Sequence, residues 1–236
     1  EITLPNSVKT IGYSAFSNCD KLAKVDLGQG VTKIDNYAFS TCPSIKEIVI
    51  PNSVTSIGEY AFDKCTNLAT VTVGDSTITI GASAFNGCIE LTTVVLGKKV
   101  ETIGGNAFYG CIRLSSINFP AELKYINGNA FNNCDALTEI TLPNSVKTIG
   151  YSAFSNCDKL AKVDLGQGVT EIGNYAFSEC GKLVNIYCRP TTPPTIGYYT
   201  FNNIGDDYKI YVPAESLDTY TNKWTTHEKH IFKGTF

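Results

Sequence analysis

The sequence contains no methionine, one tryptophan, two histidines and only two arginines among its 236 residues. Because position 1 is not methionine, we expect the chain to be a segment of a longer protein whose targeting signals lie elsewhere. No apolar run approaches the ~18–20 residues that a membrane-spanning helix requires. The formal net charge of -3 and the scarcity of arginine argue against a nucleic-acid-binding surface. With 43% hydrophobic and 17% charged residues, the composition excludes disorder.

The dominant feature of the sequence is an internal repeat. Cysteine, phenylalanine and isoleucine each recur every 23 residues for eight repeats, and a ninth, degenerate repeat follows one residue late at 196–201. A fixed period of this length is typical of a solenoid, in which each coil contacts only its neighbours. The repeated cysteines and phenylalanines are Cys19, Cys42, Cys65, Cys88, Cys111, Cys134, Cys157 and Cys180, and Phe16, Phe39, Phe62, Phe85, Phe108, Phe131, Phe154 and Phe177.

Each repeat also contains a segment that alternates apolar and other residues, as Val25 and Leu27 do. This alternation predicts a strand with one buried face, and stacked copies should form a parallel sheet with strands ~4.8 Å apart. After a Pro-Asn-Ser or Gly-Gln-Gly turn, Val31 and Ile34 predict a second short extended stretch. The other copies of the first strand are Ile48/Ile50, Val71/Val73, Val94/Leu96, Ile117/Phe119, Ile140/Leu142, Val163/Leu165 and Ile186/Cys188.

The A-F-x-x-C-x-x-L part of each repeat has helical spacing but a length of only about two turns. We expect a single helical or 3-10 turn there, with the phenylalanine ring filling the space between adjacent coils. A glycine usually precedes this part, which suggests a positive φ or a close approach of two backbones. Asp35 and Asn127 replace that glycine, and both residue types tolerate a positive φ.

The cysteines allow two interpretations, a ladder of metal ligands or disulfides and a column of buried free thiols. No C-x-x-C pair occurs, and stacked coils give neighbouring cysteines a poor geometry for a disulfide. We therefore favour buried free thiols, which behave as small hydrophobic side chains. Cys188 occupies a strand position and is expected in the core as well. No metal and no cofactor is predicted.

The repeat unit, for example Ile57 to Leu68 (IGEYAFDKCTNL), resembles the BspA-like class of leucine-rich repeats. The resemblance implies a right-handed leucine-rich repeat solenoid, with a parallel β-sheet on the concave face and short strands and helical or 3-10 turns on the convex side. It covers residues 1–203, about nine coils truncated at the N-terminus, and we expect 204–236 to be a C-terminal cap. Where the general leucine-rich pattern has asparagine, this chain has Gly30, Ser53 or Ser145, so no asparagine ladder is expected at that position.

The cap should contain a final strand and a short helix. Ile210 and Val212 alternate as a strand does, and Pro213 is a favourable residue with which to begin a helix. That helix would place Leu217, Tyr220 and Trp224 on one face, which covers the last coil.

The family resemblance implies a cell-surface or secreted protein that acts in adhesion. Its partners would be proteins, including host extracellular matrix or cell-surface proteins, or other microbes; nucleic acid and membrane insertion by this segment are not expected. Two alternatives stay open, a passive structural stalk or accessory module that displays another domain, and a polysaccharide-active enzyme. The enzyme is disfavoured, because Asp26 and Asp164 have no carboxylate partner in their columns and no catalytic residue is predicted. His227 and His230 are spaced i, i+3 and not i, i+4 as in zinc-binding H-E-x-x-H helices.

Candidate binding residues are few, because the outward strand positions are mostly small and neutral. Glu1 with Lys24 and Glu139 with Lys162 are expected to form exposed ion pairs. Tyrosines near the repeated glycine form either an adhesive stripe or a cover over the edge between turns. The densest candidate patch, which the cap junction also explains, comprises Tyr187, Arg189, Tyr198, Tyr199 and Tyr208.

One long segment of the sequence occurs twice. Residues 1–42 and 139–180 differ only at Lys33/Glu171, Asp35/Gly173 and Thr41/Glu179. Packing alone would not preserve the exposed positions so well, so we infer a recent duplication or recombination. An array that changes length in this way suits a binding or spacing protein better than an enzyme, whose site needs fixed geometry.

Overall fold

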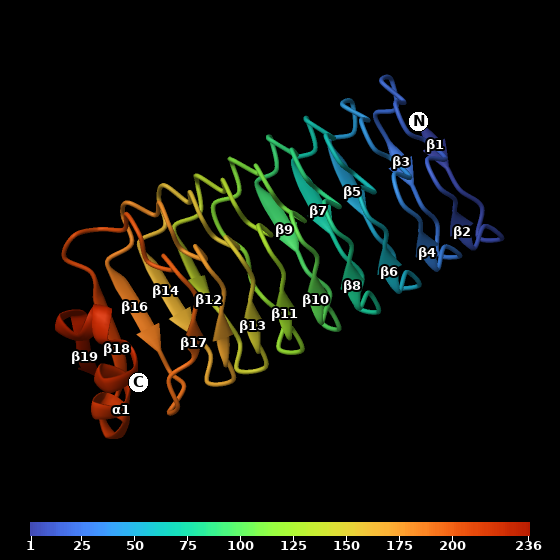
Figure 1. Ribbon diagram of the computed structural model, residues 1–236. Coiled ribbons are helices and arrows are strands. Elements are labelled where there is room, and N and C mark those ends of the chain that lie inside the picture. Colours follow the sequence, from blue (N-terminus) through green and yellow to red (C-terminus); the bar gives the residue numbers. More distant parts are fainter.

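The computed structural model describes residues 1–236 and shows an elongated stack of coils with a helical end (Figure 1). Each full coil has about 23 residues, and most coils contribute one short strand to each of two sets of parallel strands, which lie on either side of the core. Partner residues lie 23 positions apart, as in the pairs Glu47–Thr70 and Ile103–Ile126. The predicted leucine-rich repeat solenoid with a 23-residue period is therefore confirmed.

The first set of strands corresponds to the predicted alternating segments. Glu139 pairs with Lys162 and Thr141 with Asp164, in the predicted register. The set is divided into separate ladders, β1–β3, β5–β7–β9 and β12–β14–β16–β18–β19. Its members are β1 (Ile2–Thr3), β3 (Val25–Asp26), β5 (Glu47–Val49), β7 (Thr70–Thr72), β9 (Thr93–Val95), β12 (Glu139–Thr141), β14 (Lys162–Leu165), β16 (Asn185–Cys188) and β18 (Lys209–Pro213).

One predicted strand of this set, at Ile117 and Phe119, does not form. Ile117 is still buried, but Phe119 is only half-buried, and its ring packs edge-on against the ring of Phe131 at 5.6 Å. Other coils carry leucine, isoleucine, valine or cysteine at this position. We attribute the break to the larger ring, which occupies space that the regular ladder leaves to an aliphatic side chain.

The second set of strands confirms the extended stretch predicted around Ile34. Its nine members form one unbroken parallel ladder in chain order. Each buries its isoleucine, except that Ile196 in the last, degenerate repeat is only partly buried. The members are β2 (Thr10–Ile11), β4 (Lys33–Ile34), β6 (Ser56–Ile57), β8 (Thr79–Ile80), β10 (Thr102–Ile103), β11 (Tyr125–Ile126), β13 (Thr148–Ile149), β15 (Glu171–Ile172) and β17 (Thr195–Ile196).

The core contains a continuous column of phenylalanine rings, as predicted. From Phe39 to Phe177 these rings have no solvent exposure, and each is stacked on its neighbours with centroids 5.2–5.5 Å apart. Burial of a ring of this size contributes several kcal/mol, and an aromatic contact adds ~0.5–1.5 kcal/mol beyond the burial itself. The column therefore links neighbouring coils over most of the array.

The outer part of each coil differs from the predicted helical or 3-10 turn. It contains i to i−3 hydrogen bonds, such as Ser40 N–H to the carbonyl of Tyr37 at 3.0 Å. The alternate amide groups, however, donate to the next coil, as Phe39 N–H does to the carbonyl of Ala61 at 2.7 Å. Two residues per coil have a left-handed backbone, for example Tyr37 and Thr41 with φ of 60° and 58°. Such residues interrupt a helix, so the prediction of a helical turn was wrong.

The repeated glycine is required by close approach and not by a positive φ. A Cβ on Gly81 would lie 2.5 Å from the carbonyl carbon of Gly58 in the preceding coil. The residues with positive φ lie two positions later in each coil, so the positive φ expected at Asp35 and Asn127 was wrong. Asp35 is accommodated differently, because its carboxylate accepts a hydrogen bond from the backbone N–H of Asn36 at 2.9 Å.

The nine cysteines are free thiols, and all except the half-buried Cys19 are buried. From Cys42 to Cys180, each repeated thiol donates a hydrogen bond to the carbonyl of the phenylalanine 26 residues earlier, with sulfur–oxygen distances of 3.0–3.4 Å. Burial raises the pKa of Cys42 to about 11 and that of Cys65 to about 12. These thiols therefore stay protonated at neutral pH, as the interpretation of structural thiols requires.

The turns after the first strands carry asparagine bonds that the sequence analysis did not predict. Asn6 and Asn144 each accept a hydrogen bond through Oδ1 from the backbone N–H of the glutamine one coil later, at 2.8 and 2.9 Å. The serine position behaves differently, because the hydroxyl of Ser145 donates to the carbonyl of Leu123 at 2.6 Å. Asparagine side chains thus link consecutive turns. They lie one residue before the position of Ser145, at which the sequence analysis expected no asparagine ladder.

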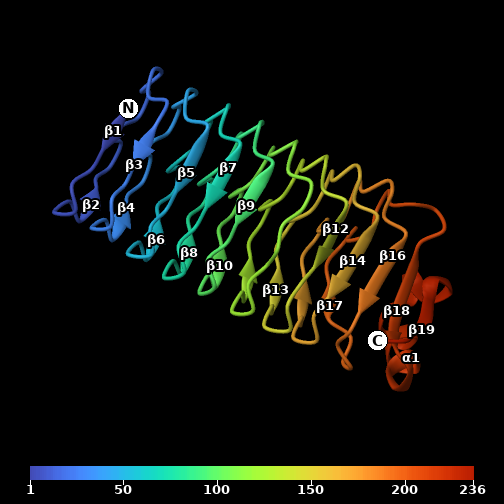
Figure 2. The same ribbon diagram turned by 180° about the vertical axis from the view of Figure 1, so that it is seen from behind.

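The C-terminal end contains the predicted strand and helix, followed by an additional strand. Ile210 and Val212 are buried in β18, followed by the short 3-10 helix η1 (Ala214–Ser216) and α1 (Leu217–Lys223). The second 3-10 helix η2 (Thr225–His230) then leads into β19 (Ile231–Gly234), which pairs in parallel with β18 and was not predicted (Figure 2).

The helical end is anchored by side chains that reach backbone carbonyls about 30 residues earlier. Tyr220 Oη donates to the carbonyl of Pro190 at 2.8 Å, and Trp224 Nε1 donates to that of Pro194 at 3.0 Å. Both aromatic side chains are buried, as the amphipathic pattern predicted. The proline-rich insertion that shifts the last repeat by one residue is thus the surface on which the helix rests.

Candidate recognition surfaces

The outward side chains of the first set of strands form the two predicted columns along the molecule. The predicted ion pairs occur, with Nζ of Lys24 3.0 Å from Glu1 and Nζ of Lys162 3.8 Å from Glu139. All four side chains are well exposed, so solvent screens these pairs and they contribute little stability. Between the two pairs the column carries small residues such as Thr70, Thr93 and Ser116.

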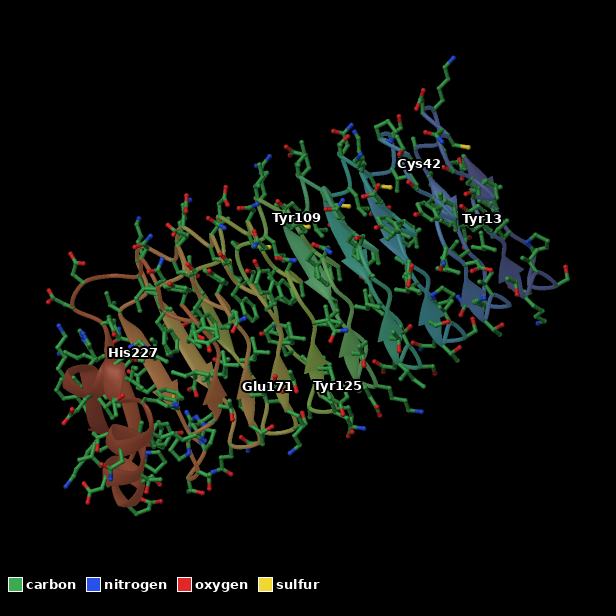
Figure 3. The ribbon with its side chains drawn as sticks, in the orientation of Figure 1. Tyr13, Cys42, Tyr109, Tyr125, Glu171 and His227 are labelled. Atoms are coloured by element: carbon green, nitrogen blue, oxygen red, sulfur yellow. The ribbon has the colours of Figure 1, made fainter.

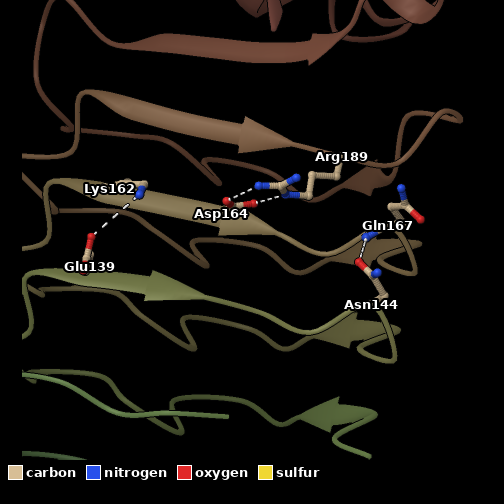
Figure 4. Close-up of polar contacts among 6 residues, drawn as sticks. All are labelled: Glu139, Asn144, Lys162, Asp164, Gln167 and Arg189. Atoms are coloured by element: carbon tan, nitrogen blue, oxygen red, sulfur yellow. Dashed lines mark hydrogen bonds and ion pairs between the residues drawn. The ribbon is translucent and has the colours of Figure 1, made fainter. Parts of the chain in front are cut away.

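Arg189 does not project freely from this face, because it forms a bidentate pair with Asp164 (Figure 4). Nε and Nη2 of Arg189 donate to the two carboxylate oxygens at 2.6 and 2.7 Å. Asp164 is only 7% exposed, and the hydrogen bond to this carboxylate raises the pKa of Arg189. The sequence analysis missed this pair, because the two residues are 25 positions apart and only the turn after β16 brings the guanidinium back over β14.

An aromatic cluster covers the same face beside Arg189. The ring of Tyr187 stacks on that of Tyr211 with centroids 4.9 Å apart, and Phe236 lies edge-on to Tyr187 at 6.4 Å. The guanidinium of Arg189 lies 5.2 Å from the centroid of Phe236. Phe232, on β19 beside Tyr211, is also exposed. We call these five residues the sheet-face cluster. Phe232 and Phe236 were missed because β19 was not predicted, and Tyr211 was missed although it lies on the predicted strand β18.

Tyr198 and Tyr199 lie on another surface, at the outer turn of the last repeat. They are the two most exposed tyrosines near the helical end, at 79% and 62%. Tyr199 stacks on Tyr175 of the preceding coil at 5.3 Å. Both line a hollow of about 480 Å³ together with Trp224 and His227.

Tyr208 lies in a third place, the junction between the last coil and the helical end. Its hydroxyl is 2.8 Å from Nδ1 of His227, and its ring stacks on that of His230 at 3.7 Å. Burial raises the pKa of Tyr208. Burial also lowers the pKa of His227, and the nearby His230 lowers it further. Figure 3 shows His227 at this end of the array, opposite Tyr13. The structure therefore brings together Tyr187 and Arg189, but neither Tyr198 and Tyr199 nor Tyr208 joins them.

The tyrosines of the outer turns form two separate runs. In the first, Tyr37 stacks on Tyr60 at 4.8 Å, and Tyr13 lies edge-on to Tyr37 at 5.5 Å. The second consists of Tyr151, Tyr175 and Tyr199 together with Tyr198. Serine and asparagine occupy the equivalent positions of the coils between them, Ser83, Asn106 and Asn129.

The structure contains no group of three or more His, Cys, Asp or Glu side chains that could hold a metal ion. Each histidine of the H-E-K-H motif has its Nδ1 engaged with Tyr208, His227 with its hydroxyl and His230 with its carbonyl. None of the helices has the length and apolar character that crossing a bilayer requires.

Comparison with known proteins places this repeat pattern in a family. The model of the BspA type leucine rich repeat region matches residues 1–115 and 101–228, with six copies. No curated protein sequence matches the chain.

Solved structures of bacterial leucine-rich repeat proteins have the same fold. One from T. pallidum is 30% identical over 81% of this chain and 86% of its own, with a TM-score of 0.65. One from Eubacterium ventriosum is 37% identical over 64% of this chain and 41% of its own, with a TM-score of 0.62. The pneumococcal vaccine antigen PcpA, 22% identical over 99% of this chain and 67% of its own, shares the fold with a TM-score of 0.64.

Proposed function

Since the chain belongs to the BspA-type leucine-rich repeat family, we propose that it is a non-enzymatic recognition module of a cell-surface or secreted protein. It binds protein partners through its repeat surface and acts in adhesion. The partners are host extracellular matrix proteins, host cell-surface proteins or proteins of other microbes. The observation that carries this proposal is the sheet-face cluster.

The residue types of the cluster support protein binding. Tyrosine and arginine are enriched among the residues that dominate binding energy, and such residues gather in compact patches. Phe232 and Phe236 are 42% and 51% exposed, so a partner can cover them. Tyr187 is already held by Tyr211, and Arg189 by Asp164, so that little side-chain freedom is lost on binding.

The polar chemistry of the same face favours recognition over catalysis. Asp164 is the most buried carboxylate there, and both of its oxygens accept hydrogen bonds from Arg189. The two hydrogen bonds occupy both oxygens of this carboxylate. Its main contribution is to fix the guanidinium beside the aromatic rings.

Binding of the purified chain to immobilised matrix proteins and to host cells tests the proposal. We expect a double variant, Tyr187→Ser with Phe236→Ser, to weaken binding by about 30-fold, which corresponds to ~2 kcal/mol for loss of anchor residues. The matched control is Val49→Ser, because Val49 occupies the column position of Tyr187 and is also exposed, but lies several coils away. Circular dichroism should show both variants folded.

Two results would contradict the proposal. If the chain binds none of these partners, the passive stalk is the better interpretation. If Val49→Ser weakens binding as much as the double variant does, the sheet-face cluster is not the anchor.

A further inference from the structure

A groove runs along the outer turns of five consecutive coils, away from the strands that carry the sheet-face cluster. It has a volume of about 440 Å³. Its walls include three tyrosines, and its base includes an asparagine and three serines that are nearly buried. We call it the outer-turn groove, and its defining residues are Tyr109, Asn132, Tyr151, Ser152, Tyr175 and Ser178.

Two hydroxyl groups at the base of the groove are free to bind a ligand. Ser152 and Ser178 are 5% and 3% exposed, and their hydroxyls make no hydrogen bond within the protein. No completely sealed side-chain oxygen lacks a partner, so these hydroxyls open to solvent through the groove. In the same row, Ser155 differs because its hydroxyl donates to the carbonyl of Ser178 at 3.0 Å. A nearly buried hydroxyl without a protein partner favours a ligand or water that supplies one.

One tyrosine of the groove lining, Tyr175, has a left-handed backbone with φ of 59°, which is uncommon for a bulky residue. Asn129 has the same conformation two coils earlier, with φ of 56°, and asparagine adopts it more readily. The backbone therefore does not explain the tyrosine at this position.

The groove is almost uncharged. Glu179 is the single charged side chain of its lining, and it already accepts a hydrogen bond from Nδ2 of Asn203 at 2.7 Å. The remaining polar groups are amides and hydroxyls next to aromatic faces. Because no basic side chain lines the groove, it offers no complement to a phosphate or sulfate.

We propose that the outer-turn groove binds a neutral oligosaccharide that lies along the axis of the solenoid. Tyr151 and Tyr175 lie 5.7 Å apart along the groove, and Tyr199 follows Tyr175 at 5.3 Å just beyond the groove lining; both spacings are close to the length of one sugar unit in an extended glycan. The sugars pack against the exposed edges of the tyrosine side chains, and their hydroxyls bind Ser152 and Ser178. This activity uses a different surface and a different class of ligand from the protein recognition proposed above.

Titration calorimetry with neutral tetrasaccharides tests this proposal, with cellotetraose and N-acetylated chitotetraose as the probes. The informative variant is Tyr175→Asn, because asparagine occupies the equivalent position at Asn106 and Asn129 and fits the backbone. We expect it to weaken binding about tenfold through loss of the stacking ring. The matched control is Tyr37→Asn, since Tyr37 lies in the almost identical segment 1–42 and has the same left-handed backbone, and it should leave the affinity unchanged.

A second variant and a second probe make the test specific. Ser178→Ala should also weaken binding, since it removes a hydroxyl from the base of the groove without disturbing the fold. A sulfated tetrasaccharide should bind no better than the neutral ones. The proposal is overturned if neither neutral tetrasaccharide binds, if Tyr37→Asn has the effect of Tyr175→Asn, or if the sulfated sugar binds more tightly.

The two binding proposals fail independently. The double variant Tyr187→Ser with Phe236→Ser should retain tetrasaccharide binding, whereas Tyr175→Asn should retain binding to proteins. If Tyr175→Asn instead abolishes binding to a protein and leaves the sugars unaffected, the groove is a protein site and the glycan proposal is wrong.

Discussion

The duplicated segments 1–42 and 139–180 show how strongly the structure formed by one sequence depends on the coils that pack against it. Phe154 and Cys157 are completely buried, whereas their counterparts Phe16 and Cys19 are half-buried. The strands differ as well, since β14 has four residues and its counterpart β3 has two. The ring of Phe154 is stacked between those of Phe131 and Phe177, whereas the ring of Phe16 is stacked on that of Phe39 only. Burial and strand length are therefore properties of the stack and not of the repeat alone.

Asp26 and Asp164, which are equivalent residues of the two copies, differ even in their hydrogen bonds. Oδ1 of Asp26 accepts the backbone N–H of Gly28 at 2.9 Å, and Gly28 has a φ of +61°. Asp164 instead pairs with Arg189, and the residue equivalent to Arg189, 138 positions earlier and beyond the first copy, is Pro51. The same carboxylate thus stabilises a local turn in one copy and positions a guanidinium in the other.

The largest expected difference between the copies concerns the phenylalanine column. Phe154→Ala should destabilise the protein by ~3–5 kcal/mol, because a buried ring between two others is replaced by a cavity. Phe16→Ala should cost roughly half as much, since Phe16 is stacked on one side only and is half-buried. Denaturant unfolding followed by circular dichroism measures both. Equal losses would show that the first coil is packed as tightly as the internal ones.

A smaller effect is expected from removal of the guanidinium that distinguishes Asp164 from Asp26. Arg189→Ala leaves a nearly buried carboxylate without its partner, and loss of one member of a buried pair costs about 3–5 kcal/mol. Because about one third of the Arg189 side chain is exposed, we expect ~2 kcal/mol. Asp26→Ala, at the exposed equivalent position, serves as the control and should cost clearly less.

The third prediction concerns pH and distinguishes the helical end from the first copy, which contains no histidine. Burial lowers the pKa of His227 below its ordinary value of 6.5. The unfolded chain therefore binds a proton more readily than the folded one, and stability falls as pH decreases below about 6.5. Hydrogen exchange at pH 7.5 and 5.5 should show a loss of protection at 208–230 that His227→Gln abolishes. A loss of equal size in residues 1–42 would contradict this assignment.

The sequence predicted the repeat, the two sets of strands, the phenylalanine column and the buried thiols. Each of these features recurs with the 23-residue period, because equivalent residues of successive coils stack in register. Phe119 and the outer turns were not predicted correctly. At Phe119 the period continues but the side chain is too large for the ladder. In the outer turns, helical spacing is present, but hydrogen bonds to the next coil at 2.7–3.0 Å replace those within a helix.

The candidate surfaces were less predictable, because they join residues of different coils outside the common period. Tyr187 and Arg189 do lie together, but Phe236 follows the unpredicted strand β19, and the sequence analysis did not pair Asp164 with Arg189. Tyr198 and Tyr199 were grouped with them by proximity in sequence, although outer turns and strands are different faces of one coil.

The smallest effect is expected from the ion pair that both copies share. Lys24 lies 3.0 Å from Glu1, and Lys162 lies 3.8 Å from Glu139 while also facing the ring of Tyr187 at 5.7 Å. Solvent screens both ammonium groups, so Lys24→Ala and Lys162→Ala should leave the denaturation midpoint nearly unchanged. If the Lys162→Ala variant loses stability and Lys24→Ala does not, the contact of Lys162 with Tyr187 is responsible. A double variant, Lys162→Ala with Tyr187→Ser, then separates the contribution of this contact from that of the ion pair. Two equal losses would instead mean that the shared pair stabilises the sheet face in either context.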